Sequence, residues 1–257
     1  MSYAVRDCLT MLRRNLRWAR RFPAMTAVLI GLPVIILLLF VYVFGGTMGA
    51  GLAGDRGDYA DYVTPGILML AIAGTAQGTA IAVATDMKEG IIARYRTMAI
   101  FRPSVLAGHV LGSLSQTMLG LAVVVGVAVA VGFRPTAGVV EWFATAGLLA
   151  LVALAMIWLS VGLGLWAKTV ESASNLPMPL MLLPFLGSGF VPTDSMPAVV
   201  RWFAENQPFT PMMETLRGLL LGTGIGSSGL VAAVWCVAII LVGYRWSVHL
   251  YNRDPAN

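Results

Sequence analysis

Long apolar stretches dominate this chain, and almost none of them contains a charged residue. Six segments are candidates to cross a bilayer, namely residues 22–44, 62–85, 105–132, 142–167, 176–191 and 229–249. A transmembrane helix needs about 20 apolar residues to cross a hydrocarbon core of about 30 Å. Five of the segments reach that length, whereas 176–191 is short and is interrupted by Pro177, Pro179 and Pro184. The pattern predicts an all-α integral membrane protein with six transmembrane helices, forming one domain over residues 1–257.

The overall composition argues against a soluble protein. Of the 257 residues, 58% are hydrophobic and only 11% are charged, and the mean hydropathy is +0.81. A soluble fold of this length has too few charged residues here to cover so much apolar surface. The net charge of +5 does not indicate nucleic-acid binding, because the excess lies beside the apolar stretches, where it attracts anionic lipid.

Basic residues are distributed unevenly between the segments that join the six stretches. If all six are spans, one side of the membrane receives 13 of the 17 Lys and Arg residues. The other side receives Arg56, Arg134, Arg201 and Arg217, and its first loop carries Asp55, Asp58 and Asp61. Because positively charged segments stay on the cytoplasmic side, both termini are predicted to be cytoplasmic.

Residues 1–21 are predicted to form an amphipathic helix that lies in the membrane interface. Apolar residues recur at steps of three and four on one face, and a second face carries Arg6, Arg13, Arg17 and Arg20. Such a helix places its arginines among the lipid headgroups. Two interpretations remain open, a lipid-facing anchor and an elbow that also contacts a cytoplasmic partner.

The inner loop over residues 86–103 is the most highly charged segment after the N-terminal one. Its charged residues and its glycine are Asp86, Lys88, Glu89, Gly90, Arg94, Arg96 and Arg102. The acidic residues come first and the arginines last, which suits the dipole of a short helix that Pro103 would end. Such a helix would give a soluble motor a lever to push, although an ordinary solvated loop has the same charge pattern.

The outer segment over residues 192–228 is too apolar for a plain loop and too rich in proline, including Pro208, for a span. A pair of short re-entrant or interfacial helices fits this composition, since irregular backbone at membrane depth must be shielded by protein. Glu214 and Arg217 are three residues apart and are expected to pair on one helical face.

Several kinds of chemistry have no support in the sequence. The chain has no phosphate-binding loop, and its two lysines, Lys88 and Lys168, do not follow glycine. The spans carry no ionisable residue except at their ends, which argues against an ion-coupled carrier. His109 is expected within reach of the lipid headgroups. We therefore predict no catalytic residue, no metal site and no cofactor in this chain.

Polar residues inside the spans are few. Thr75, Gln77 and Gln116 belong to the densest polar clusters of the second and third spans. Most such residues are expected to form hydrogen bonds between helices. The alternative is that these three line a substrate path.

Two motifs carry a resemblance to a known family. The first is D-x-x-x-G-x-x-x-R-x-R at Asp86, Gly90, Arg94 and Arg96, and the second is the segment 188–220, S-G-F-V-P…N-Q-P-F-T-P…E-T-L-R-G-L-L. With them the whole chain resembles the membrane subunit of type-2 ABC transporters, and among these the daunorubicin-resistance-like drug and antibiotic exporters. One departure is Met98-Ala99-Ile100, where relatives often have Met-Pro-Ile.

The resemblance implies a fold, partners and a function. The fold would have six transmembrane helices, the interfacial helix, a coupling helix after the second span and outer re-entrant helices before the last span. Two membrane subunits, identical or related, would pair with two copies of a separate ATPase that holds ATP and Mg. A hydrophobic or amphiphilic compound would leave a bacterial cell through the plasma membrane, along spans one, two and five. Export of a lipid or lipid-linked polysaccharide, or a non-transporting assembly role, are the alternatives.

Overall fold

The computed structural model describes residues 23–46, 56–90 and 102–252, and all regular structure in these ranges is helical. The helices are α2 (Pro23–Leu39), η1 (Phe40–Phe44), α4 (Arg56–Lys88), α6 (Arg102–Val131), α7 (Val139–Trp166), α8 (Val170–Asn175), α9 (Met178–Leu182), η2 (Leu183–Leu186), η3 (Thr193–Ser195), α10 (Ala198–Asn206), α11 (Phe209–Leu221) and α12 (Ser228–Asn252). The predicted interfacial helix over residues 1–21 lies outside these ranges.

Within the described residues, five helices are long and apolar enough to span a membrane. These spans are Ala27–Phe44, Gly57–Lys88, Leu106–Val131, Val139–Trp166 and Ser228–Asn252. They correspond to five of the six predicted segments. The remaining segment, 176–191, does not form one long helix, because the chain there is divided into α9, η2 and non-helical backbone.

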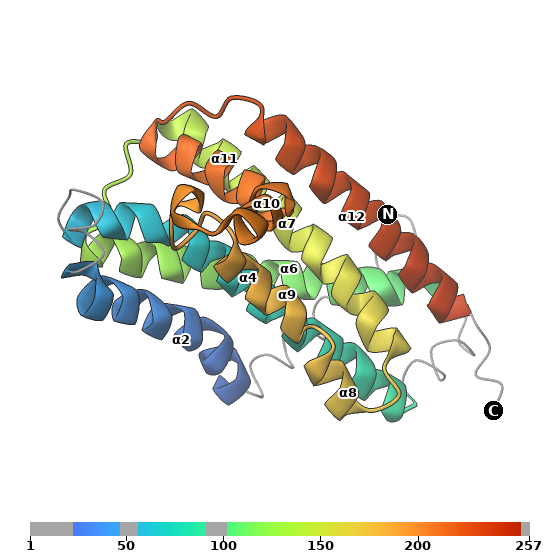
Figure 1. Cartoon of the computed structure of the whole chain (residues 1–257). Coiled ribbons are helices and arrows are strands. Elements are labelled where there is room, and N and C mark those ends of the chain that lie inside the picture. The colour runs from blue at the N-terminus through green and yellow to red at the C-terminus, as the bar shows by residue number, and fades with distance from the viewer. Residues whose placement is uncertain (1–22, 47–55, 91–101, 253–257) are drawn as a thin grey trace.

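The long helices form a bundle with two ends, which we name after residues found there (Figure 1). At the Lys88 end, α4 and α7 finish and α6 and α8 begin. At the Arg217 end, α6 and α11 finish and α4, α7 and α12 begin. The charged side chains of the bundle are therefore gathered at its two ends, as a bilayer requires.

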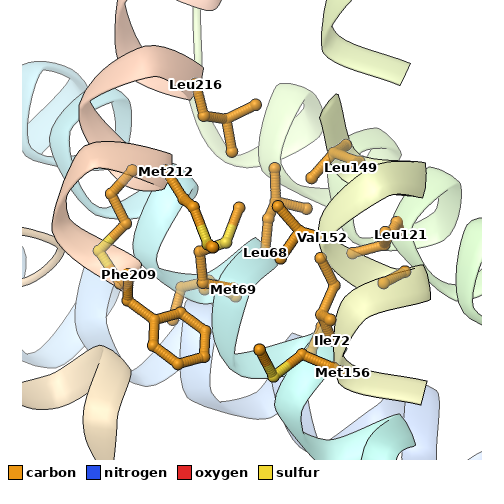
Figure 2. Close-up of a cluster of buried hydrophobic side chains, with 14 of the residues drawn as sticks. Leu68, Met69, Ile72, Leu121, Leu149, Val152, Met156, Phe209, Met212 and Leu216 are labelled. Atoms are coloured by element: carbon orange, nitrogen blue, oxygen red, sulfur yellow. The ribbon is translucent and has the colours of Figure 1, made fainter. Parts of the chain in front are cut away.

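Helix α4 is the centre of the bundle. About 67% of the residues in its most apolar stretch are buried, against 17% of those in the corresponding stretches of α2 and α12. Leu68, Met69 and Ile72 of α4 meet side chains of α7 and of α11, including Met156 and Met212 (Figure 2). Because lipid tails are as apolar as these side chains, this core is stabilised mainly by close packing.

Backbone contact between α4 and α7 depends on a glycine. A Cβ atom at Gly164 of α7 would lie 2.6 Å from the carbonyl oxygen of Ala80 in α4. Any larger residue would push the two helices apart, and small residues are the usual means of close approach between membrane helices.

The outer helices present large apolar side chains to their surroundings. Ile35 of α2 is 62% exposed, and Leu230 of α12 is 73% exposed. An apolar surface of this extent on a single chain indicates contact with lipid or with another membrane helix.

Although residues 176–191 do not form one long helix, the segment from α8 to η2 runs along α4 from the Lys88 end towards the Arg217 end. Gln77 Nε2 donates to the Ser174 carbonyl at 2.7 Å, and the Tyr62 hydroxyl donates to the Ser188 carbonyl at 2.9 Å. On α4 these donors are 15 residues apart, which is about 22 Å of helix. Pro177 separates α8 from α9, because proline lacks the N–H that a continuous helix needs.

One predicted boundary was wrong. Helix α4 begins at Arg56, so Asp58 and Asp61 belong to the helix and not to an acidic loop. Asp58 lies in the first turn, where a carboxylate favours the helix dipole. Pro103 is the second residue of α6, where proline is well tolerated, and the helix that it was predicted to end falls largely outside the described residues.

Candidate functional site

The described part of the predicted coupling loop begins with exposed charges. Lys88 and Glu89 are exposed at the end of α4. The Glu89 N–H donates to the Thr85 carbonyl at 2.9 Å, and Gly90 follows with a φ of +67°. Glycine adopts this left-handed conformation without strain, so Gly90 ends the helix. Arg94 and Arg96 lie outside the described residues, and Arg102 begins α6.

A buried contact joins the two helices that flank this loop. His109 Nε2 of α6 lies 3.0 Å from Asp86 Oδ2 of α4, and these side chains are only 5% and 13% exposed. Nε2 has no partner with hydrogen-bond geometry, so this contact is not a hydrogen bond. It is an ion pair only when His109 is protonated. The prediction that His109 reaches the headgroups was wrong, since its side chain packs inside the bundle.

Helix α8, which also begins at the Lys88 end, has a polar cap. The Thr169 hydroxyl accepts a hydrogen bond from the Ser172 N–H at 3.1 Å. A backbone N–H in the first turn and the Thr169 hydroxyl lower the pKa of Glu171. A carboxylate that stays ionised at this position favours the start of the helix.

The polar residues inside the bundle connect helices, as predicted for most of them. The Thr79 hydroxyl donates to Ser113 Oγ at 2.9 Å, and the Thr117 hydroxyl donates to Thr75 Oγ1 at 3.1 Å. Both bonds join α4 to α6, and Gln77 joins α4 to α8 through the Ser174 carbonyl.

The three residues predicted to line a path do not share one site within the described chain. Thr75 and Gln116 line a void of about 10 Å³ between α2, α4 and α6. That volume holds at most one water molecule. Gln77 instead faces α8.

At the opposite end, a half-buried arginine holds three segments together. Arg217 Nη2 of α11 donates to the Ser188 carbonyl at 2.9 Å and to the Tyr62 carbonyl at 3.3 Å. Its guanidinium carbon lies 4.2 Å from the centre of the Tyr62 ring, a favourable cation–π distance. We call Arg217, Tyr62 and Ser188 the Arg217 clasp. It fixes α11 and the backbone after η2 against the first turns of α4.

The predicted pair of Glu214 and Arg217 does not form. Glu214 is exposed, and its Oε2 accepts a hydrogen bond from the Ser228 hydroxyl of α12 at 2.8 Å. Arg217 turns to backbone carbonyls instead, because its side chain points into the bundle. This segment contains the short helices α10 and α11, and Pro208 immediately precedes α11.

A close backbone contact beside the clasp was not predicted. A Cβ atom at Gly66 of α4 would lie 2.8 Å from the Gly189 carbonyl oxygen. Gly189 belongs to the second family motif, but nothing in the sequence identifies its partner on α4. Gly66 and Tyr62, four residues apart on one face, together form the surface of α4 that receives this backbone.

A chain of long apolar helices with charged sites at both ends and polar contacts between helices defines a multi-pass membrane protein. Residues 6–221 match the family model described as ABC-2 type transporter. Because the match covers most of the chain, the protein belongs to this family and is a membrane permease component. Members of the family work with an ABC ATPase.

Two relatives extend the comparison over nearly the whole length. A daunorubicin resistance ABC transporter permease protein of Streptomyces coeruleorubidus is 28% identical over 257 residues, covering 99% of this chain and 89% of the relative. A probable doxorubicin resistance ABC transporter permease protein of Mycobacterium tuberculosis is 23% identical over 249 residues, covering 92% of this chain and 88% of the relative. Both relatives are permease subunits by name.

Proposed function

We propose that this chain is the membrane subunit of an ATP-driven exporter that moves a hydrophobic or amphiphilic, drug-like compound out of a bacterial cell. Membership of the ABC-2 family and two relatives named for daunorubicin and doxorubicin resistance support the proposal. A lipid or lipid-linked polysaccharide would suit the same architecture. A non-transporting assembly subunit is the alternative from another class, and an ATPase encoded beside this gene would argue against it.

The energy source in this proposal is a separate ABC ATPase in two copies, which binds ATP and Mg. Two membrane subunits, identical or related, would complete the assembly. The absence of a phosphate-binding loop from the sequence supports a division of labour in which this chain has no enzymatic role.

The topology we propose has six crossings, with the Lys88 end and both termini in the cytoplasm. Residues 176–191 would make the fifth crossing, since the chain from Ser174 to Ser188 follows about 22 Å of α4 between Gln77 and Tyr62. The excess of Lys and Arg on the predicted inner segments favours this orientation in the plasma membrane. Helices α10 and α11 would then be re-entrant at the outer face.

The observation that supports coupling best is the reach of α4. This helix has 33 residues, or about 50 Å, and it connects the exposed charges of Lys88 and Glu89 to the Arg217 clasp. We propose that the ATPase binds residues 86–103 and moves α4 as a lever, so that the outer segment opens when the ATPase closes.

The test uses the permease reconstituted with its ATPase. Glu89→Ala is expected to insert normally but to lower export and substrate-stimulated ATP hydrolysis together, because a partly desolvated charge contact is worth about 2–5 kcal/mol. Arg94→Ala should behave in the same way. Glu141→Ala is the matched control, since Glu141 begins α7 at the other end of the bundle and should leave both activities unchanged.

Glu214→Ala distinguishes the role of the Arg217 end of α4 from that of the Lys88 end. It is expected to impair export while the ATPase stays bound, because Glu214 lies at the Arg217 end. If the Glu89 and Arg94 variants bind the ATPase and export as well as the parent, residues 86–103 are only a solvated loop and the coupling proposal is wrong.

A further inference from the structure

A cleft opens at the Arg217 end between the end of α10, α11 and the first turns of α12. Its volume is about 440 Å³, which is in the range of small-molecule sites. Helix α12 lies on the opposite side of the bundle from α2 (Figure 1). The cleft therefore lies away from the void that Thr75 and Gln116 line.

The mouth of the cleft is acidic. Glu205 and Glu214 both line it. Glu205 accepts a hydrogen bond from Arg201 Nε at 2.8 Å, which raises the pKa of Arg201, and Arg201 also pairs with Asp194 at 2.8 Å. One guanidinium is thus shared by two carboxylates, and the Arg217 guanidinium is turned to the Tyr62 and Ser188 carbonyls. The mouth keeps a net negative charge.

The floor of the cleft is apolar and faces lipid. Val231 and Trp235 line it from one face of α12, and Trp235 lies seven residues beyond Ser228, or about 10 Å along the helix. Leu230 and Val234 beside them are 73% and 60% exposed. Tryptophan is typical of the boundary between headgroups and acyl chains. The cleft therefore changes from acidic to apolar over the thickness of a headgroup layer.

A buried acceptor in the wall of the cleft has no donor. Gln207 is only 4% exposed, and its Nε2 donates to the Leu183 carbonyl at 3.0 Å. That bond fixes the orientation of the amide, and Oε1 is left without a hydrogen-bond partner. The Oε1 atom has almost no exposed area, so Gln207 fixes the wall of the cleft and does not meet a ligand there.

We propose that the cleft binds a phospholipid with a primary ammonium headgroup, of the phosphatidylethanolamine type, in the leaflet at the Arg217 end. A primary ammonium has three N–H donors for carboxylate oxygens, here those of Glu205 and Glu214, which line the cleft. An acyl chain lies on Val231 and Trp235, which line it from α12. This site is independent of the compound that the permease exports.

The proposal predicts a specific selectivity. A choline headgroup has the same positive charge but no N–H to donate, so charge attraction alone does not distinguish the two lipids. Loss of a hydrogen bond to a charged group lowers affinity by about tenfold or more. We expect the cleft to prefer ethanolamine over choline lipid by at least that factor.

The experiment measures lipid binding to the purified full-length chain by native mass spectrometry. The probes are phosphatidylethanolamine, phosphatidylcholine and phosphatidylglycerol with identical acyl chains. Glu214→Gln is expected to reduce the preference for ethanolamine over choline to about one, whereas the control Glu141→Gln keeps it. Trp235→Leu should weaken both lipids equally, because it changes only the apolar floor. Unfolding temperatures in pure phosphatidylcholine check that each variant is folded.

Three outcomes would overturn the proposal. Equal affinity of the parent for ethanolamine and choline lipids would remove the headgroup assignment. An unchanged preference in Glu214→Gln would move the site elsewhere. The third test uses a water-soluble amphiphilic amine such as dodecylamine, below its critical micelle concentration. If this amine displaces the lipid, the occupant is a free organic cation instead of a lipid.

Discussion

Replacement of Arg217 by methionine tests the energetic role of the Arg217 clasp. Methionine has a similar length and keeps the apolar packing of the side chain, but it removes both hydrogen bonds and the cation–π contact with Tyr62. Each hydrogen bond from a charged donor is worth about 1.5–3 kcal/mol, and the cation–π contact about 0.5–2 kcal/mol.

Two terms reduce the expected effect. Arg217 Nε is buried without a partner, and an unsatisfied donor costs about 1–3 kcal/mol that the substitution recovers. The Ser188 carbonyl keeps its hydrogen bond from the Tyr62 hydroxyl. We therefore expect Arg217→Met to lower the free energy of unfolding by about 2–4 kcal/mol. Tyr62→Phe, which loses only the hydroxyl, should lower it by about 1 kcal/mol.

The assay is reversible unfolding in mixed detergent and SDS micelles, followed by circular dichroism. Arg201→Met is the matched control, because Arg201 is an exposed arginine in the same segment. Its substitution should change the free energy of unfolding by no more than about 0.5–1 kcal/mol. An Arg217→Met protein as stable as the parent, or two arginine variants destabilised equally, would refute the reasoning.

Two further predictions concern contacts inside the bundle. A double-mutant cycle of Asp86→Asn and His109→Gln, measured by the same unfolding assay, should give an interaction energy of about 0.5–3 kcal/mol. A value near zero would mean that the two side chains are neighbours without energetic coupling. Gly164→Ala should destabilise the bundle by about 1–3 kcal/mol, because its Cβ would lie 2.6 Å from the Ala80 carbonyl. The control is Gly147→Ala in the same helix, because the Cβ position of Gly147 has open space around it. This variant should gain up to about 1 kcal/mol of stability from helix propensity. Equal effects of the two substitutions on the free energy of unfolding would contradict the packing argument.

Hydropathy predicted the five long spans because their apolar side chains must meet lipid or one another. It placed the start of α4 six residues late, at Tyr62, because residues 56–61 include Arg56, Asp58 and Asp61. Hydropathy measures how well a segment suits contact with lipid. A helix turn that is covered by neighbouring helices can contain polar residues, so hydropathy does not detect it. Tyr59, for example, is 2% exposed inside this polar stretch.

The fifth predicted segment shows the opposite limitation. Its apolar composition predicted a span, but its three prolines break the helix into α9, η2 and the turn between α8 and α9. The mean hydropathy of the segment does not show that its prolines lack a backbone N–H, and those missing donors decide where a helix ends.

The Arg217 clasp was not predictable from residue types. Its acceptors are backbone carbonyls of Ser188 and Tyr62, and every residue has a carbonyl, so no motif marks them. Asp86 and His109 carried a signal that was available. They lie close to the facing ends of two helices that follow one another along the chain, and consecutive helices are usually neighbours in space.

Pro65 links the clasp to the proposed lever. It lies inside α4 and has no N–H to donate to the carbonyl of Asp61, so the helix is weakest one turn from its contact with Arg217. Movement of the Lys88 end is carried rigidly only as far as this proline. Beyond it, the polar attachments of Tyr62 to the outer segment are the Arg217 guanidinium and the Tyr62 hydroxyl, whereas Gly66 and the apolar side chains of α4 pack on that segment from the Lys88 side of the proline. It follows that Arg217→Met should reduce export while ATPase binding persists, since the first turns of the lever then lose their attachment through Arg217.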